Sequence, residues 1–344
     1  MDIKDITEKI MGFKNLDKDE ACEALKYIIE GRANDCQIAS FLTALRMKGE
    51  TIDEISGFCM AMLQKAERVT TRHTDVVDTC GTGGDRKNTF NISTAAAFIA
   101  AGAGVIIAKH GNRSVSSMCG SADVLEQLGV NINLEPSGIS KCIDEIGIGF
   151  IFAPIAHTAM KNVTKARKDI AIKTVFNILG PLTNPAMANR RVLGVYDKNL
   201  IDKMVYVLKN LGVKRAFVVF GMEGLDEFST AGNSLVRYLN DGAVTEFALN
   251  PEELGFKKCS IDDLRGGDAK INAEIIRNIL SCRESGAKKD SSMLNAAAAI
   301  IAGGKTESFQ EALQMADYSI RSGSAIDKLN KLVGLTNKFQ PASV

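Results

Sequence analysis

The fold of this chain is decided by the stretch DTCGTGGD at residues 78–85. The apolar pair before it predicts a short strand over 75–78, and the apolar run after it predicts a helix over 92–101. Three glycines within four residues allow positive φ angles and let a ligand approach the backbone. The free N–H groups of such a loop, together with a helix N-terminus, form an anion site. A tight turn with Ser93 as a simple helix cap has the same pattern, so the stretch alone leaves both interpretations open.

From this loop onward, apolar runs typical of strands alternate with helical periodicity. Further strands and helices are expected at 105–108, 121–128, from Ser137, at 149–152, 192–195, 199–211 and 216–220. This order predicts an α/β fold in which a mostly parallel sheet is flanked by helices. The runs 235–239 and 244–248, joined by Asp241-Gly242, predict a hairpin at an edge of the sheet. Residues 271–337 are expected to be helical again.

The N-terminal part of the chain has a different character. Residues 2–67 carry apolar side chains at helical spacing and predict four helices, with Asp17, Asn34 and Thr51 as N-caps. Residues 157–190 interrupt the strand–helix alternation, and we interpret them as a helical return to this part. We therefore expect a small all-helical domain, a larger α/β domain and a cleft between them. The expected bounds are 1–70 with 157–190 for the small domain, and 71–156 with 191–344 for the α/β domain.

Composition excludes several classes of protein. The 344 residues include 42 Lys and Arg against 41 Asp and Glu, so a large basic nucleic-acid surface is not expected. Eight scattered cysteines and three histidines do not have the spacing of a zinc site, and they favour reduced thiols in the cytoplasm. The apolar run 95–108 is too short for a membrane span. We expect a cytoplasmic protein that binds neither nucleic acid nor membrane.

Two more loops are expected at the edge of the sheet where the glycine loop lies, because ligands of open α/β sheets collect at the carboxyl ends of strands. The stretch KHGNRSVSS (109–117) offers cations and hydroxyl groups that suit a phosphate. Asp226 and Glu227 follow strand 216–220, and Mg²⁺ uses one or two carboxylates plus substrate phosphates. Each loop alone could be a solvated turn. Together they predict a site for a phosphorylated metabolite with Mg²⁺, although neither a P-loop nor a dinucleotide fingerprint is present.

Several of these segments resemble the signature motifs of the anthranilate phosphoribosyltransferase family. They are DTCGTGGD (78–85), NTFNISTA (88–95), AKHGNRSVSS (108–117), CGSADVLE (119–126), FNILGPLTNP (176–185) and LDE (225–227). The resemblance implies the type III phosphoribosyltransferase fold, which nucleoside phosphorylases share, and a homodimer through the helical domain. It also implies transfer of the phosphoribosyl group from 5-phosphoribosyl 1-diphosphate to the amine of anthranilate, a step of tryptophan biosynthesis that uses Mg²⁺.

The resemblance further implies the residues of the site. The phosphoribosyl diphosphate would be bound by Gly81, Gly84, Asp85, Thr89, Asn91, Ser93, Thr94, Lys109, Ser117 and Ser121. Anthranilate would be bound by Gly81, Asn112 and Arg167. Two Mg²⁺ ions would be ligated by Ser93, Asp226 and Glu227, and the catalytic residues would be Arg167 and His110. Part of the anthranilate pocket would come from the helical domain.

This chain departs from the family pattern near the expected anthranilate pocket. The family commonly has His-Pro-Ala-Met where residues 157–160 read His-Thr-Ala-Met, and Leu-Gly-x-Arg-Thr where residues 170–174 read Ile-Ala-Ile-Lys-Thr. Two other functions remain as alternatives. A nucleoside phosphorylase of related fold would not need the Asp226-Glu227 pair, and a non-catalytic nucleic-acid-binding relative would carry a basic stripe and degraded motifs.

Overall fold

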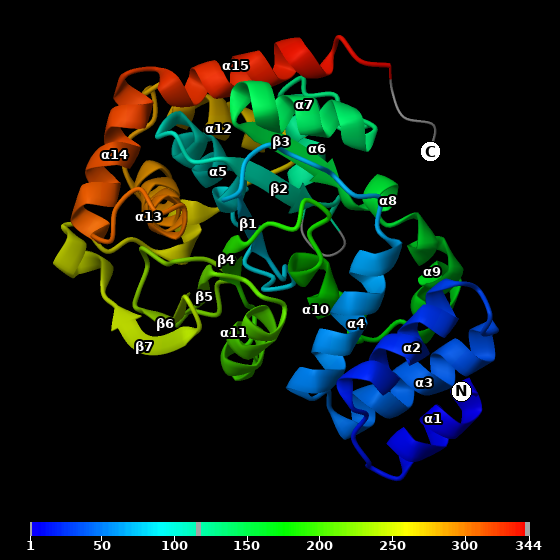
Figure 1. Cartoon of the computed structure of the whole chain (residues 1–344). Coiled ribbons are helices and arrows are strands. Elements are labelled where there is room, and N and C mark those ends of the chain that lie inside the picture. The colour runs from blue at the N-terminus through cyan, green and yellow to red at the C-terminus, as the bar shows by residue number, and fades with distance from the viewer. Residues whose placement is uncertain (1, 115–117, 341–344) are drawn as a thin grey trace.

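The computed structural model describes residues 2–114 and 118–340, and it has two parts (Figure 1). A bundle of N-terminal helices lies beside a larger α/β domain with a mostly parallel sheet, as the sequence predicts. Within these two ranges, no helix is long and apolar enough to cross a membrane.

The N-terminal bundle contains four helices, and the sequence marks their beginnings. They are α1 (Ile3–Met11), α2 (Lys18–Ile29), α3 (Asp35–Lys48) and α4 (Ile52–Lys65). The side chains of Asp17, Asn34 and Thr51 accept N–H groups of the first turns of α2, α3 and α4, which confirms the three predicted caps. The apolar faces meet in one core, where the rings of Phe41 and Phe58 pack edge to face at 6.1 Å.

The sheet has the strand order β3-β2-β1-β4-β5-β6-β7. Its strands are β1 (Val77–Gly81), β2 (Ile107–Gly111), β3 (Ile148–Phe152), β4 (Arg190–Gly194), β5 (Arg215–Gly221), β6 (Ser234–Asn240) and β7 (Ala243–Leu249). The first five pair in parallel, whereas β6 and β7 form the predicted antiparallel hairpin at one edge. The carboxyl ends of β1, β2, β4 and β5 therefore lie along one rim, and each of these strands ends at a glycine.

Helices cover this sheet on both faces. They are α5 (Ile92–Gly102), α6 (Ser121–Gln127), α7 (Pro136–Ile146), α11 (Ile201–Asn210), α12 (Ala269–Leu280), α13 (Ala287–Ala302), α14 (Phe309–Arg321) and α15 (Ser324–Thr336). Almost every side chain of α5 is buried, because α13, α14 and α15 surround it. The helix α11 lies on the opposite face and packs against α4, which joins the bundle to the sheet. Short helices η3 (Lys198–Leu200), η4 (Pro251–Leu254) and η5 (Ile261–Leu264) complete the domain.

The segment after β3 returns to the N-terminal bundle (Figure 1). It contains α8 (Ala153–Ala156), η1 (Thr158–Met160), α9 (Lys161–Ile170), α10 (Phe176–Leu179) and η2 (Gly180–Leu182). The helix α9 packs on α2 and α3, and the Asn162 side chain donates to the carbonyl oxygen of Ile29 at 2.8 Å. The exact division into a discontinuous helical domain stays a prediction.

Several predicted boundaries are wrong, including those of β1, β2 and α7. The strand predicted over 75–78 is β1, which begins two residues later and includes Gly81. The strand predicted over 105–108 is β2, so Lys109 and His110 are strand residues and not loop residues. Their backbones pair with β3, and the Lys109 ammonium and the His110 N–H have buried partners, which lets polar residues continue the strand. The helix α7 begins at Pro136, which has no N–H group to satisfy, rather than after a Ser137 cap.

Candidate active site

Two of the three predicted loops are in direct contact at the carboxyl rim of the sheet. The backbone N–H of Gly83 donates to Oδ2 of Asp226 at 2.7 Å, and the N–H of Ser93 donates to Oε1 of Glu227 at 3.1 Å. Glu227 therefore satisfies an N–H group in the first turn of α5, where a negative charge is favoured. Asn91, which stands at the N-cap, makes no such bond with its side chain. The glycine loop and the acidic loop thus form one site.

Glycine at the strand ends makes this approach possible. A Cβ on Gly81 would lie 2.3 Å from Oδ2 of Asp226, and a Cβ on Gly194 would lie 1.6 Å from the backbone oxygen of Asp226. Any larger residue at the end of β1 or β4 would displace the acidic loop. These two glycines therefore fix where the carboxylates lie relative to the glycine loop.

The carboxylates of the rim are electrostatically unsatisfied. The surrounding protein removes water from Asp226 and raises its pKa, and the neighbouring Asp85 raises it further. Desolvation also raises the pKa of Glu227, with Asp226 as the next cause. Oδ1 of Asp85 accepts the N–H of Lys87 at 3.1 Å, while its Oδ2 is buried without a partner. Raised pKa values and an orphaned oxygen indicate a place where positive charge would be stabilised.

This donor set fits a magnesium ion. Within residues 2–114 and 118–340, no group of three His, Cys, Asp or Glu side chains forms a metal cage. Mg²⁺ does not need such a cage, because it binds through one or two carboxylates and takes its other ligands from water and substrate phosphates. Asp226, Glu227 and the hydroxyl of Ser93 are all oxygen donors at this rim, and Asp85 adds a fourth.

Lys109 lies beneath the glycine loop, in β2. Its ammonium donates to the carbonyl oxygen of Thr79 and, at 3.2 Å, to Oγ of Ser93. Only 4% of the residue is exposed, so this is an internal cation and not the loop cation expected from the sequence. It still acts on the site, because its charge opposes the rise in the pKa of Glu227. Nearby, Oγ1 of Thr94 is buried and has no hydrogen-bond partner.

His110 connects the sheet to the returning helical segment. Its N–H donates to Oδ1 of Asp78 at 3.0 Å, and Nδ1 lies 3.1 Å from the carbonyl oxygen of Gly180. Its ring lies 5.2 Å from the ring of His157, and its Nε2 is buried without a partner. Burial lowers the pKa of His110 to about 4, and the charge of Arg191 adds to the effect. The imidazole is therefore neutral near pH 7 and can accept a hydrogen bond or a proton.

Arg167 lies in the last turn of α9. Its guanidinium lies over the ring of Phe176, 5.0 Å from the ring centre, and partial burial lowers its pKa. In the described part of the chain, no carboxylate lies within ion-pair distance of it. Such a half-buried guanidinium suits an anionic ligand. Asn112, the other residue expected at the anthranilate, is exposed, and its Oδ1 accepts the N–H of Arg113 at 2.7 Å.

The remaining predicted residues make local contacts, and their role in the site stays a prediction. The Ser121 hydroxyl donates to the backbone oxygen of Asn112 at 3.3 Å, and Thr89 forms an isolated bridge with Arg265. Gly84 adopts a φ of 78°, as expected for a residue of the glycine loop. Ser117 lies outside the described residues.

Three residues that hold this region together were not predicted from the sequence. The Asn272 side chain donates to Oδ1 of Asn91 at 3.0 Å. Arg191 of β4 forms a buried ion pair with Asp78 of β1 at 3.0 Å and donates to the carbonyl oxygen of Pro181 at 3.1 Å. A charged residue next to apolar residues in a predicted central strand is the signal that could have identified Asp78 and Arg191. For Asn272, the only signal in the sequence was its polar side chain within the amphipathic pattern of α12.

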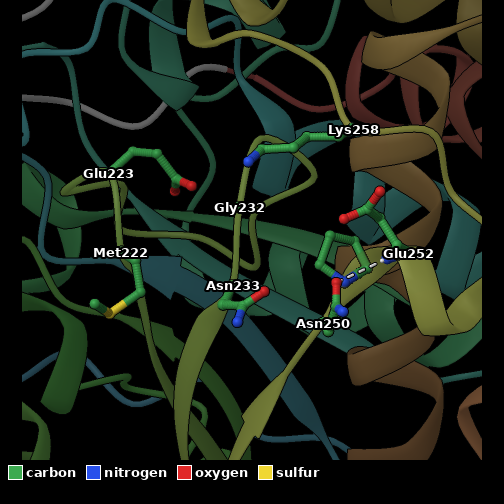
Figure 2. A pocket seen from close by; sticks show the side chains of 8 residues that line it. Met222, Glu223, Gly232, Asn233, Asn250, Glu252 and Lys258 are labelled. Carbon is green, nitrogen blue, oxygen red and sulfur yellow. Dashed lines mark hydrogen bonds between the residues drawn. The ribbon is translucent and has the colours of Figure 1, made fainter.

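A hollow of about 350 Å³ lies away from these residues, between the turn after β5 and the end of β7 (Figure 2). It is lined by Met222, Glu223, Gly232, Asn233, Asn250, Pro251, Glu252 and Lys258. The carboxylate of Glu223 lies against Gly232, where a Cβ would be 1.7 Å from Oε1. None of the site residues expected from the sequence lines this hollow.

Comparison with known families places both parts of the chain. Residues 73–326 match a family described as "Glycosyl transferase family, a/b domain", and residues 4–66 match "Glycosyl transferase family, helical bundle domain". An anthranilate phosphoribosyltransferase of Desulforamulus reducens is 51% identical over 96% of this chain and 96% of its own length. One from Acetivibrio thermocellus is 50% identical over 98% of this chain and 97% of its own length.

Solved structures give the same result. The anthranilate phosphoribosyltransferase of Thermus thermophilus superposes with a TM-score of 0.92 at 38% identity, over 98% of this chain and 100% of that one. The enzyme of Saccharomyces cerevisiae in complex with PRPP and Mg superposes with a TM-score of 0.90 at 29% identity, over 98% of each chain. On its two matched domains and these full-length similarities, the chain belongs to the anthranilate phosphoribosyltransferase family.

Proposed function

We propose that this chain transfers the 5-phosphoribosyl group from 5-phosphoribosyl 1-diphosphate to the amine of anthranilate and releases diphosphate, in tryptophan biosynthesis. The observation that carries the proposal is the convergence of Asp226 and Glu227 on the N–H groups of Gly83 and Ser93. The family membership supports the same reaction, since relatives with this name are about half identical over nearly the whole chain.

Diphosphate binding is assigned to the glycine loop and its surroundings. The N–H groups of Gly83 and Ser93 donate to carboxylate oxygens, so this loop and helix end favour anionic oxygens and suit a diphosphate beside them. We assign the phosphoribosyl diphosphate to Gly81, Gly84, Asp85, Thr89, Asn91, Ser93, Thr94, Lys109 and Ser121. Two Mg²⁺ ions would be held by Ser93, Asp226 and Glu227, and when bound they would neutralise the charge that grows on the leaving diphosphate.

The chemistry at the ribose depends on charge and orientation. Substitution at C1 passes through a state that resembles an oxocarbenium ion, as in glycoside cleavage. The Lys109 ammonium and the N-terminus of α5 are preorganised to stabilise negative charge on the departing oxygens. The anthranilate amine is neutral at pH 7 and needs orientation more than deprotonation.

Orientation of anthranilate is assigned to Arg167, together with Gly81 and Asn112. A guanidinium without a carboxylate partner can take the carboxylate of anthranilate, in a contact worth about 1.5–3 kcal/mol. His110 is neutral and its buried Nε2 is free, so it can accept the proton that the amine loses after the new bond forms. The departures from the family pattern lie beside these residues and would alter the shape of this pocket.

We further propose that residues 1–70 and 157–190 act as one helical domain, and that this domain forms a homodimer. Three large apolar side chains of the bundle support this assignment, because Met11, Phe13 and Met47 are 65%, 69% and 73% exposed. The eight cysteines lie in the described part of the chain and form no disulfides there, which supports a reducing, cytoplasmic location. Sedimentation of the protein and of a Phe13→Asp variant tests the dimer, which the variant should weaken.

An assay of anthranilate fluorescence tests the reaction. With phosphoribosyl diphosphate and Mg²⁺ present, the fluorescence of anthranilate should disappear, and it should persist when Mg²⁺ is replaced by a chelator. A parallel reaction with a nucleoside and inorganic phosphate tests a phosphorylase activity. No consumption of anthranilate by folded protein under any of these conditions would overturn the proposal.

A further inference from the structure

The side chain of Lys173 lies against the glycine loop, although in the sequence Lys173 belongs to the returning segment between α9 and α10. Its ammonium is 3.7 Å from the centre of the Tyr196 ring. The same ammonium is 3.3 Å from where a Cβ on Gly84 would stand. The side chain is half-buried, and it reaches across from the helical segment to the α/β domain.

Tyr196 holds this lysine in a fixed relation to the loop. The N–H of Tyr196 donates to Oγ1 of Thr82 at 3.1 Å, and the N–H of Thr82 donates to the backbone oxygen of Gly194 at 2.9 Å. The ring is therefore tied to the glycine loop and to the end of β4. On the other side, the N–H of Thr174 donates to Oδ1 of Asn177 at 2.9 Å and anchors the backbone next to Lys173.

The charge of Lys173 has no protein anion to neutralise it. Across residues 2–114 and 118–340, no carboxylate lies within 4.0 Å of its ammonium, whereas Lys165 of the same segment pairs with both Asp35 and Asp169. A ring face stabilises a cation only modestly, by about 0.5–2 kcal/mol. A half-buried ammonium at a loop that already gathers anion donors therefore points to an anionic group of the ligand.

We propose that Lys173 binds the diphosphate of 5-phosphoribosyl 1-diphosphate, with Tyr196 as its platform. The inference rests on the proposed function and extends it to a residue outside the loop motifs. Gly84 lies in the part of the glycine loop assigned to the diphosphate, so a cation beside Gly84 reaches the same oxygens. The substrate then contacts both the α/β domain and the helical segment, and its binding ties the two together.

Steady-state kinetics of four variants test this assignment. We expect Lys173→Met to raise the KM for phosphoribosyl diphosphate about tenfold, which corresponds to about 1.4 kcal/mol. The KM for anthranilate should change less than about twofold, because Arg167 and not Lys173 is assigned to that substrate. Lys173→Arg should restore most of the affinity, since a guanidinium keeps the charge and stacks on Tyr196. Tyr196→Leu should give an intermediate KM, and Lys161→Met, an exposed lysine of the same segment, should match the wild type.

Product inhibition identifies the group that Lys173 contacts. Inhibition by inorganic diphosphate should weaken in Lys173→Met by the same factor as the KM, while inhibition by ribose 5-phosphate should not change. If only the inhibition by ribose 5-phosphate weakened, Lys173 would contact the 5-phosphate and not the diphosphate. That result would overturn the proposal. Wild-type KM values in an active, folded Lys173→Met protein would overturn it as well. Failure of the proposed reaction itself would be distinct, because the wild type would then not consume anthranilate at all.

Discussion

Replacing both acidic residues of the rim by their amides should stabilise the fold and abolish the reaction. In Asp226→Asn with Glu227→Gln, the side-chain oxygens can still accept the N–H groups of Gly83 and Ser93. The amides are uncharged, so the desolvation cost and the repulsion between neighbouring carboxylates, which raise the pKa values of both acids, disappear. Each unit of a raised carboxyl pKa is worth about 1.4 kcal/mol, and both side chains keep some contact with solvent, so we expect a net gain on the order of 1–3 kcal/mol at pH 8 without Mg²⁺.

The dependence on pH has a definite sign. A carboxyl group whose pKa is higher in the folded than in the unfolded protein leaves the folded state with more bound protons between the two values. The unfolded pKa values lie near 3.8 for Asp226 and 4.5 for Glu227. The two protonated carboxyl groups therefore favour the folded state at low pH. Their contribution to the free energy of unfolding is lost as the pH rises from there to neutral and above. The difference in stability between the double variant and the wild type should grow over the same range.

Thermal unfolding in chelator at several pH values measures this difference. A gain of 1 kcal/mol raises Tm by roughly 2–4 °C for a domain of about 150–250 residues, so an increase of about 2–12 °C is expected at pH 8. Mg²⁺ should raise the Tm of the wild type and leave that of the variant unchanged. Glu252→Gln with Glu253→Gln, an exposed acidic pair, is the matched control and should change stability by less than about 0.5 kcal/mol. A variant that melts several degrees lower, or that still turns over with Mg²⁺, would refute the reasoning.

Three further predictions concern single residues. Arg167→Ala should raise the KM for anthranilate by roughly 10- to 150-fold, from a lost contact of about 1.5–3 kcal/mol, and leave the KM for phosphoribosyl diphosphate nearly unchanged; equal rises in both would contradict its role. Gly194→Ala should reduce Mg²⁺-dependent turnover, because its Cβ would lie 1.6 Å from the backbone oxygen of Asp226; a wild-type Mg²⁺ titration would show that the acidic loop is not held there. Arg191→Met should destabilise the chain by about 3–5 kcal/mol in denaturant unfolding, because it leaves Asp78 buried and unpaired; an unchanged midpoint would show that the pair is dispensable.

The elements that the sequence predicts well are those with local signals. Caps such as Asn34 and Thr51 act within one helical turn, so the same few residues that predict the helix also make it. The meeting of the glycine loop with the acidic loop was predictable for a different reason. Parallel strands bring their carboxyl ends to one rim, and this geometric rule does not depend on which side chains make the contacts.

The ends of β1 and β2 could not be predicted, because distant partners decide them. Lys109 and His110 have the polarity of loop residues, and partners distant in sequence, such as the carbonyl oxygen of Thr79 and the carboxylate of Asp78, make them acceptable in a buried strand. The ion pair between Asp78 and Arg191 is equally remote in sequence, since it depends on β1 and β4 being neighbours. The predicted strands therefore omit Lys109, His110 and Arg191, whereas they include Asp78.

The charges of this region explain why the chain needs its substrate to complete the site. In the described part of the chain, Asp226 and Glu227 form no ion pair and keep raised pKa values despite the charge of Lys109. Arg167 and Lys173 are cations without a carboxylate partner there. The two sets form no ion pair with each other in the described part of the chain, although Lys173 reaches the glycine loop. In the proposed reaction, a metal-bound diphosphate would bring positive charge to the acids and negative charge to Lys173. The carboxylate of the second substrate would pair with Arg167. Charges without ion-pair partners therefore lie on both sides of the site in the described part of the chain, and we propose that the two substrates pair with them.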